Sequence, residues 1–265
     1  MSLDKITKLG RYFLAIPMVV FGIQHFWYAE FIVHLVPTWV PGRLFWTYFA
    51  GVALFASGLG IIINVLSRLA ATLLGSMISI WVIILHIPRV FQFPGDSEFI
   101  NVFDALCILS GAYLLSLSLP GTLPGKVLEK IARRGAKFSP YLIAVSLTVF
   151  GLENFIHGNL VFIVGAPAYE VPGKVFWVYL TSFVFIAAAF SILFSKRVGT
   201  ITVCLGIYIF FIVIIFYGPL LWANIYDGHA WATLLKGIAM TGSAFILSRE
   251  SSKVKTIALQ ESIPV

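Results

Sequence analysis

The segment "FGIQHFWYAEFIVHLVPTWVPGRLFW", residues 21–46, places two polar side chains, Gln24 and His25, near the end of an otherwise apolar run. A second version of it, "FGLENFIHGNLVFIVGAPAYEVPGKVFW", begins at residue 150. At the equivalent place, the second version carries Glu153 and Asn154. The recurrence bears on the architecture, and the change in the polar pair bears on function.

The composition predicts an all-α membrane protein. Of the 265 residues, 60% are hydrophobic and 11% are charged, and the mean hydropathy is +0.98. A water-soluble protein needs more polar surface than this. Helices are expected because no segment alternates as barrel strands do. Eight apolar runs are long enough to cross a hydrocarbon core of about 30 Å and leave no room for a soluble domain: 11–33, 45–65, 69–88, 99–118, 141–163, 175–195, 199–219 and 231–248.

The basic residues predict the orientation of these eight spans. Fourteen of the 18 lysines and arginines fall at the two ends of the chain or in loops on one side. Arg43, Arg89 and Lys174 fall on the other side, and Lys236 lies within a span. The positive-inside rule therefore places both termini in the cytoplasm. The net charge of +7 is explained by this topology and by contact with the lipid bilayer, so no nucleic-acid partner is expected.

The chain also contains an internal repeat. Residues around Tyr12 match those around Tyr141 at an offset of 129, "VPGRLFW" matches "VPGKVFW" at 131, and "GAYLLS" matches "SAFILS" at 132. We interpret this as a tandem duplication that forms two four-helix bundles, arranged as parallel repeats. The predicted divisions are a first unit, a basic connector on the cytoplasmic membrane surface, a second unit and a polar cytoplasmic tail: 1–120, 121–140, 141–248 and 249–265. Small residues in the second and sixth spans predict close helix packing: Gly51, Ser57, Gly58, Gly60, Ser182, Ala188, Ala189 and Ser191.

Polar residues are expected to share one layer in the outer part of the membrane. With 1.5 Å of rise per residue, the first unit places four in this layer: Gln24, His25, His86 and Asp104. The offsets place four more there from the second unit: Glu153, Asn154, Tyr217 and Lys236. A charge near a helix centre costs about 2.5–3.5 kcal/mol on insertion scales, which implies compensating partners. We therefore expect His25 to pair with Asp104, and Glu153 with Lys236.

These residues allow a structural and a functional interpretation. For Glu153, Lys236 and Asn154 we favour a buried polar lock that holds helix register. For Gln24, His25, His86, Arg89 and Asp104, a ligand or proton site stands beside the structural interpretation, because an imidazole near a carboxylate changes protonation near neutral pH. Acidic and basic residues also gather at the outer mouth of this unit: Glu30, His34, Arg89, Asp96 and Glu98.

Cofactor and catalytic signals are weak in this sequence. Haem ligation by His25 and His86 is disfavoured because nothing fixes their facing, and no metal-binding signature is recognised. No nucleophile motif or phosphate loop indicates an autonomous enzyme, and catalytic residues are unknown.

Three stretches, "FGIQHF", "VPTWVPGRLFWTYFAGVALFASGLGI" and "HIPRV", resemble the DoxX-like family of bacterial membrane proteins. The resemblance covers residues 11–118 and, more weakly, 141–248, where "APAYEVPG" replaces "VPTWVPG". It implies a four-helix inner-membrane unit, here duplicated, with a link to quinone or sulfur redox chemistry and to a respiratory or redox partner subunit.

The sequence therefore predicts an accessory or ligand-binding component of a bacterial inner membrane, at most a subunit of a membrane oxidoreductase. A quinone-type head group is the ligand considered for Gln24, His25, His86 and Arg89, with Asp104 setting the charge of His25. Two alternatives remain open. One is a transporter of small solutes or a proton-coupled permease, and the other is a non-catalytic scaffold.

Overall fold

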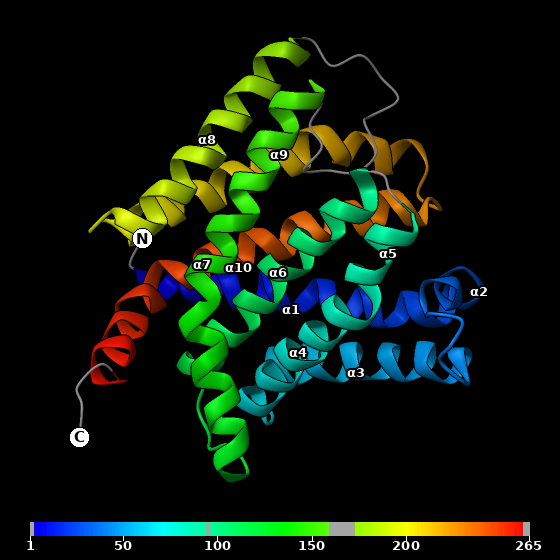
Figure 1. Ribbon diagram of the computed structural model, residues 1–265, viewed down its shortest axis with the longest axis horizontal. Helices are drawn as coiled ribbons and strands as arrows, with labels where there is room; N and C mark the ends of the chain where they lie inside the picture. The colour runs from blue at the N-terminus through cyan, green and yellow to red at the C-terminus, as the bar shows by residue number, and fades with distance from the viewer. Residues whose placement is uncertain (1–2, 94–95, 159–172, 262–265) are drawn as a thin grey trace.

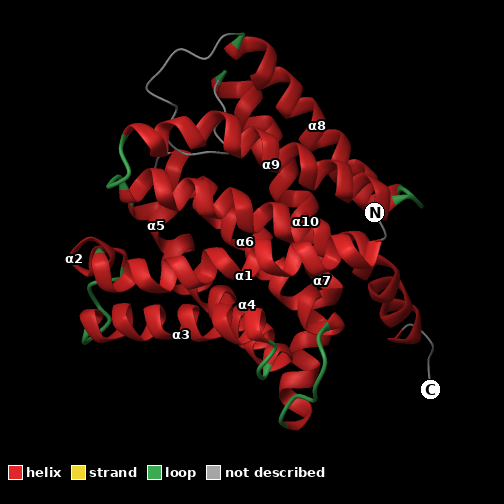
Figure 2. Cartoon of the chain, turned by 180° about the vertical axis from the view of Figure 1, so that it is seen from behind, coloured by secondary structure: helices red, strands yellow, loops and turns green. Residues whose placement is uncertain are grey.

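A computed structural model describes residues 3–93, 96–158 and 173–261 of the chain, and all the regular structure within these ranges is helical (Figure 2). Eight of its helical segments are long and apolar enough to cross a membrane. The helices, in chain order, are α1 (Leu3–Trp27), α2 (Ala29–Ile32), η1 (Val33–Leu35), α3 (Arg43–Ile63), α4 (Ser67–Trp81), η2 (Val82–His86), α5 (Ile87–Gln92), α6 (Asp96–Ser118), α7 (Gly125–His157), α8 (Lys174–Phe194), α9 (Val198–Ala223) and α10 (Gly228–Glu261). The expected end of the fifth span, 159–163, and residues 166–172 of "APAYEVPG" lie outside the described ranges.

The two "VPG" turns start equivalent helices in the same way. Gly42 precedes α3 with a φ of 66°, and Gly173 precedes α8 with a φ of 68°. Glycine adopts this left-handed conformation without the steric cost that a side chain brings. The first backbone bonds also match, because Trp46 N donates to Gly42 O over 3.3 Å and Trp177 N to Gly173 O over 3.2 Å.

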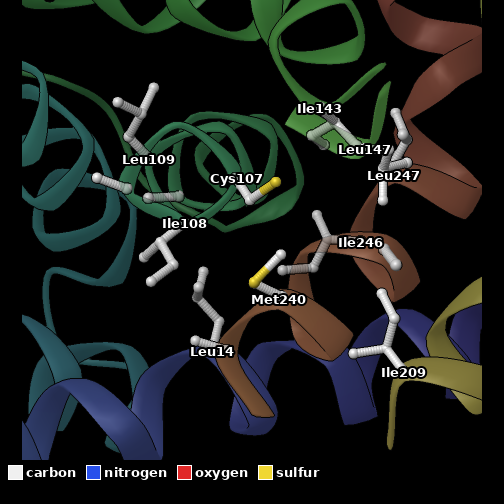
Figure 3. Packing of buried hydrophobic residues seen from close by; sticks show 14 of the residues in the cluster. Leu14, Cys107, Ile108, Leu109, Ile143, Leu147, Ile209, Met240, Ile246 and Leu247 are labelled. Carbon is white, nitrogen blue, oxygen red and sulfur yellow. The ribbon is translucent and has the colours of Figure 1, made fainter. Parts of the chain in front are cut away.

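Helices α6 and α10 pack against each other in the middle of the molecule, with α1 and α3 on one side and α8 and α9 on the other (Figure 1). Their apolar windows are each 78% buried, against 33–44% for the other six candidate spans. Figure 3 shows Cys107 of α6 close to Met240 of α10, with Leu14 of α1 nearby. The two central helices therefore form the core on which the others pack.

The two halves of the chain do not form two separate bundles. Helix α1 packs mainly against α3 and α10, and α7 packs mainly against α8 and α6. The first helix of each half therefore lies against the last helix of the other half. The sequence interpretation had each four-helix unit closing on itself, and the observed packing differs because both last helices are central.

Close packing by small residues is confirmed. A Cβ added to Gly22 of α1 would lie 2.6 Å from Phe55 N and 2.8 Å from Gly51 O on α3. Further along the same contact, a Cβ on Gly58 would lie 2.7 Å from Ala15 O. In the second half, a Cβ on Gly151 would lie 3.0 Å from Ser182 O. Missing side chains thus let these backbones approach each other.

Two segments differ from the expected spans. Residues 125–140 of the connector are not a separate surface helix, because α7 runs as one helix of 33 residues from Gly125 to His157. This part of α7 is joined to α4 by an ion pair in which Arg68 Nη2 lies 2.9 Å from Glu129 Oε1. The third span is interrupted, because α4 ends at Trp81 and a single π-helical turn, η2, precedes α5.

Candidate functional site

The shortest charged contact within the helices joins the two central ones. Lys236 Nζ on α10 lies 2.6 Å from Asp104 Oδ2 on α6. The same nitrogen donates a hydrogen bond of 2.9 Å to Asn101 Oδ1. Asn101 and Asp104 are three residues apart on one helix and therefore share a face. One lysine is thus held by two side chains of the neighbouring helix.

Both predicted charge pairs are wrong. Lys236 binds Asp104 and not Glu153, and Asp104 faces Lys236 and not His25. The prediction paired charges within each half because consecutive helices were expected to be neighbours. The structure instead brings the last helix of each half together, which places the two charges on adjacent helices.

The ion pair is buried on the acidic side and more open on the basic side. The Asp104 side chain is 3% exposed, and its Oδ1 has no hydrogen-bond donor among the described residues. The Lys236 side chain is 21% exposed. An ammonium group has three N–H donors, and the contacts to Asp104 and Asn101 use two of them. One donor of Lys236 is therefore left for another acceptor.

A second ion pair lies nearby on the first half. Arg89 of α5 donates two hydrogen bonds to Glu98 of α6, from Nη2 over 2.7 Å and from Nε over 3.1 Å. A weaker bond of 3.4 Å reaches His34 O, and the guanidinium carbon lies 5.0 Å from the centre of the Phe93 ring. Bidentate arginine–carboxylate contacts are geometrically specific as well as strong. The pair therefore fixes the end of α5 against the start of α6.

His86 lies near members of both ion pairs. It ends the π turn and lies within electrostatic range of Lys236, Glu98 and Arg89. π turns are rare and often occur at functional sites. We call the six residues of this region the central polar cluster: His86, Arg89, Glu98, Asn101, Asp104 and Lys236. Three of the five predicted site residues, His86, Arg89 and Asp104, belong to it.

Gln24 and His25 take no part in these ion pairs. His25 Nδ1 is 2.8 Å from Phe21 O, within its own helix, and its ring stacks on Trp81 with the ring centres 6.5 Å apart. Because Nδ1 donates to that carbonyl, Nε2 is left as the acceptor. Gln24 is half-buried, and no side-chain hydrogen bond joins it to a described residue. His25 is thus positioned by α1 and α4 and not by Asp104.

The equivalent residues of the second half form a contact of their own. Glu153 Oε2 lies 3.5 Å from His157 Nε2, one turn further along α7. Asn154 is fully buried, and its carbonyl accepts the Gly158 N–H that ends the helix. His157 faces Glu153, and its side chain is 28% exposed.

Sequence reasoning missed Asn101 and the π turn. Asn101 could have been found from its spacing, since it precedes Asp104 by three residues in the same predicted helix. Pro88 has no N–H for the carbonyl of Ile84, but Pro219 lies in the uninterrupted helix α9, so the proline alone did not predict the π turn. Within the described ranges, no three His, Cys, Asp or Glu side chains gather as metal ligands do.

Residues 14–92 match a protein family described as a domain of unknown function, DUF8561. This match runs from within α1 to the end of α5 and therefore includes His86 and Arg89 but not α6 or α10. No curated protein and no solved structure matches the chain.

Proposed function

We propose that this protein is a ligand-binding component of a bacterial inner membrane that holds a small, neutral, hydrogen-bonding head group, such as a quinone, at the central polar cluster. The observation that carries the proposal is the unused N–H donor of Lys236. A quinone carbonyl is a suitable acceptor for it. The Lys236 side chain is 21% exposed, so a head group can reach this donor, and a hydrogen bond to a charged group contributes about 1.5–3 kcal/mol.

The charges of the cluster favour a neutral ligand over an ion. The Lys236 ammonium is balanced by Asp104, and the Arg89 guanidinium is balanced by Glu98. The four charges of these two pairs sum to zero. An added anion or cation would leave a net charge among apolar helices, which is costly. A neutral molecule with hydrogen-bonding groups adds no such cost.

Insertion in a membrane is supported by the eight apolar helices and by the exposed aromatic residues near α2, α5 and the α9–α10 turn. Trp27 is 78% exposed, Phe91 81% and Trp222 92%. Tryptophan and other aromatic side chains of this kind are typical of a membrane interface. The distribution of basic residues supports cytoplasmic termini. We further propose that the two halves are repeats of one DoxX-like four-helix unit. From that resemblance we also propose a redox link and a redox partner subunit.

A proton-coupled transporter is the second candidate. It is supported by Asp104 Oδ1, which is shut off from solvent and has no donor among the described residues. A carboxylate of this kind can take up a proton when its lysine partner moves away. Proton flux into liposomes that is abolished by Asp104→Asn would favour this candidate over ligand storage or delivery.

Native mass spectrometry of the protein in mild detergent tests the ligand proposal. We expect the wild-type protein to retain a neutral quinone-type molecule and His86→Gln to lose it without a change in melting temperature. His34→Gln is the matched control, because His34 is exposed and lies outside the cluster. Phospholipid alone in the wild-type spectrum would contradict the proposal and leave a transporter or a scaffold. Equal loss from both variants would show that His86 has no specific role.

A further inference from the structure

The two charges of the central ion pair occupy equivalent positions of the internal repeat. Asp104 and Lys236 are 132 residues apart, the same offset that relates "GAYLLS" at 111–116 to "SAFILS" at 243–248. Their contact over 2.6 Å therefore joins one repeat position to its own copy. A residue meets its own copy only where a twofold axis passes between the two.

A second pair of equivalent positions meets two helical turns away. Gly111 and Ser243 also differ by 132, and each lies seven residues beyond the charged position on its own helix. A Cβ added to Gly111 would lie 2.8 Å from Ser243 Cβ. Seven residues correspond to almost two turns, so both contacts fall on one face of α6 and one face of α10.

The flanking helices follow the same twofold relation. On α1 and α10, a Cβ on Gly10 would lie 2.9 Å from Gly242 O. On α7 and α6, Ser139 Oγ donates to Ser110 O over 3.2 Å. Ser139 is the copy of Gly10 at the offset of 129, and Gly242 is the copy of Ser110 at the offset of 132. Each contact is thus the copy of the other with the two halves exchanged.

We infer that α6 and α10 contact each other through the same surface, which each half of the chain carries in its own version. The differences between Asp104 and Lys236 and between Gly111 and Ser243 allow a first half to pair with a second half, and they prevent two like halves from pairing. Two copies of the first half would bring two carboxylates together in this position, and two copies of the second half would bring two ammonium groups together. Like charges this close inside an apolar core repel strongly. In a pair of two second halves, the two Ser243 side chains would also overlap, because this contact has room for one serine opposite a glycine. The partner that fits each half is the other half.

Exchange of the two charges in the full-length chain tests this inference. Asp104→Lys and Lys236→Asp are each expected to lower the melting temperature sharply or to prevent accumulation in the membrane. The combined variant is expected to recover more than half of the loss, because opposite charges again face each other at the same contact. The Arg89 and Glu98 pair is the matched control, since those positions are not copies of each other. Exchange of their charges is expected to recover a smaller share.

The glycine–serine contact provides a second test without charges. Gly111→Ser alone is expected to lower the melting temperature, and Gly111→Ser with Ser243→Gly is expected to restore most of it. The inference is overturned if both combined variants are no more stable than their worse single variants. It is also overturned if the Arg89 and Glu98 exchange recovers as large a share as the central one.

Discussion

The third long helix of the first half and its counterpart in the second half carry a proline at equivalent positions, Pro88 and Pro219, yet only the first is interrupted. In the first half, α4 gives way to the π turn six residues before Pro88. In the second half, α9 continues from Val198 through Pro219 to Ala223. A proline removes one backbone bond in both cases, so the proline alone does not decide where a helix is broken.

The side chains two residues before each proline lie in different surroundings. His86 lies within electrostatic range of Lys236 and Arg89, whereas its counterpart Tyr217 is fully buried in the apolar core. A π turn rotates the side chains that follow it around the helix axis. In the first half, the side chains at this turn lie near charged residues. The same fold therefore carries a polar cluster in one half and a packed core in the other.

The largest effect is expected from removal of one member of the central ion pair. Lys236→Met leaves a buried carboxylate unpaired and is expected to cost about 3–5 kcal/mol of stability. Asp104→Asn with Lys236→Met is expected to cost much less than the two single changes added together. Thermal unfolding in detergent measures both. Additive losses would mean that the two charges are not coupled.

The control for this cycle is Glu153, which the sequence had suggested as the partner of Lys236. Glu153→Gln is expected to lose only its own contact with His157. Its effect should add to that of Lys236→Met, and a strong coupling between them would contradict the observed pairing of the two halves.

A smaller effect is expected from filling the small-residue contacts, and it should differ between the halves. In Gly22→Ala, the new methyl group meets backbone atoms of α3, with Phe55 N at 2.6 Å. In Gly151→Ala, its nearest neighbour at 2.7 Å is Ile186 Cγ1, which a rotamer change can move. We expect about 1–3 kcal/mol of destabilisation for Gly22→Ala and less for Gly151→Ala, measured by thermal unfolding. Equal losses would show that the two contacts are equally rigid.

The smallest effect on stability is expected at the two prolines. Pro88→Ala supplies the N–H that the turn lacks and should change stability by only about 1 kcal/mol. It is also expected to let the helix close and to move His86, so that the ligand retained in a native mass spectrum is reduced. Pro219→Ala should leave the retained ligand unchanged. If both variants lost the ligand to the same extent, the π turn would have no specific role in ligand binding.

Local features of this fold could be predicted from the sequence because they depend on neighbours in the chain. The run of apolar residues from 45 to 65 and the "VPG" before it predicted α3, and the structure begins that helix at Arg43. Gly51 and Gly58 were expected at a close helix contact, since a glycine in an apolar helix otherwise weakens it. For the third span, the period of the apolar residues did not show the π turn that ends at His86.

The partners of the polar residues could not be predicted in this way. Depth in the membrane grouped His86 with Asp104, but many arrangements of eight helices place the same residues in one layer. Asn101 was overlooked because its role is a hydrogen bond to Lys236, and the sequence does not show that the two residues are neighbours. Arg89 and Glu98 were both placed at the outer mouth, and only the geometry shows them as one bidentate pair.

By itself, the sequence determined the eight apolar helices and the offsets between its matching segments, because hydropathy and spacing act along the chain. Only the tertiary structure decided which helices are neighbours. The last helix of each half lies at the centre, so Asp104 meets Lys236 and not a partner from its own half. The physical reason is that a charge inside apolar helices needs an opposite charge within a few ångströms, and packing between distant segments determines which charge that is.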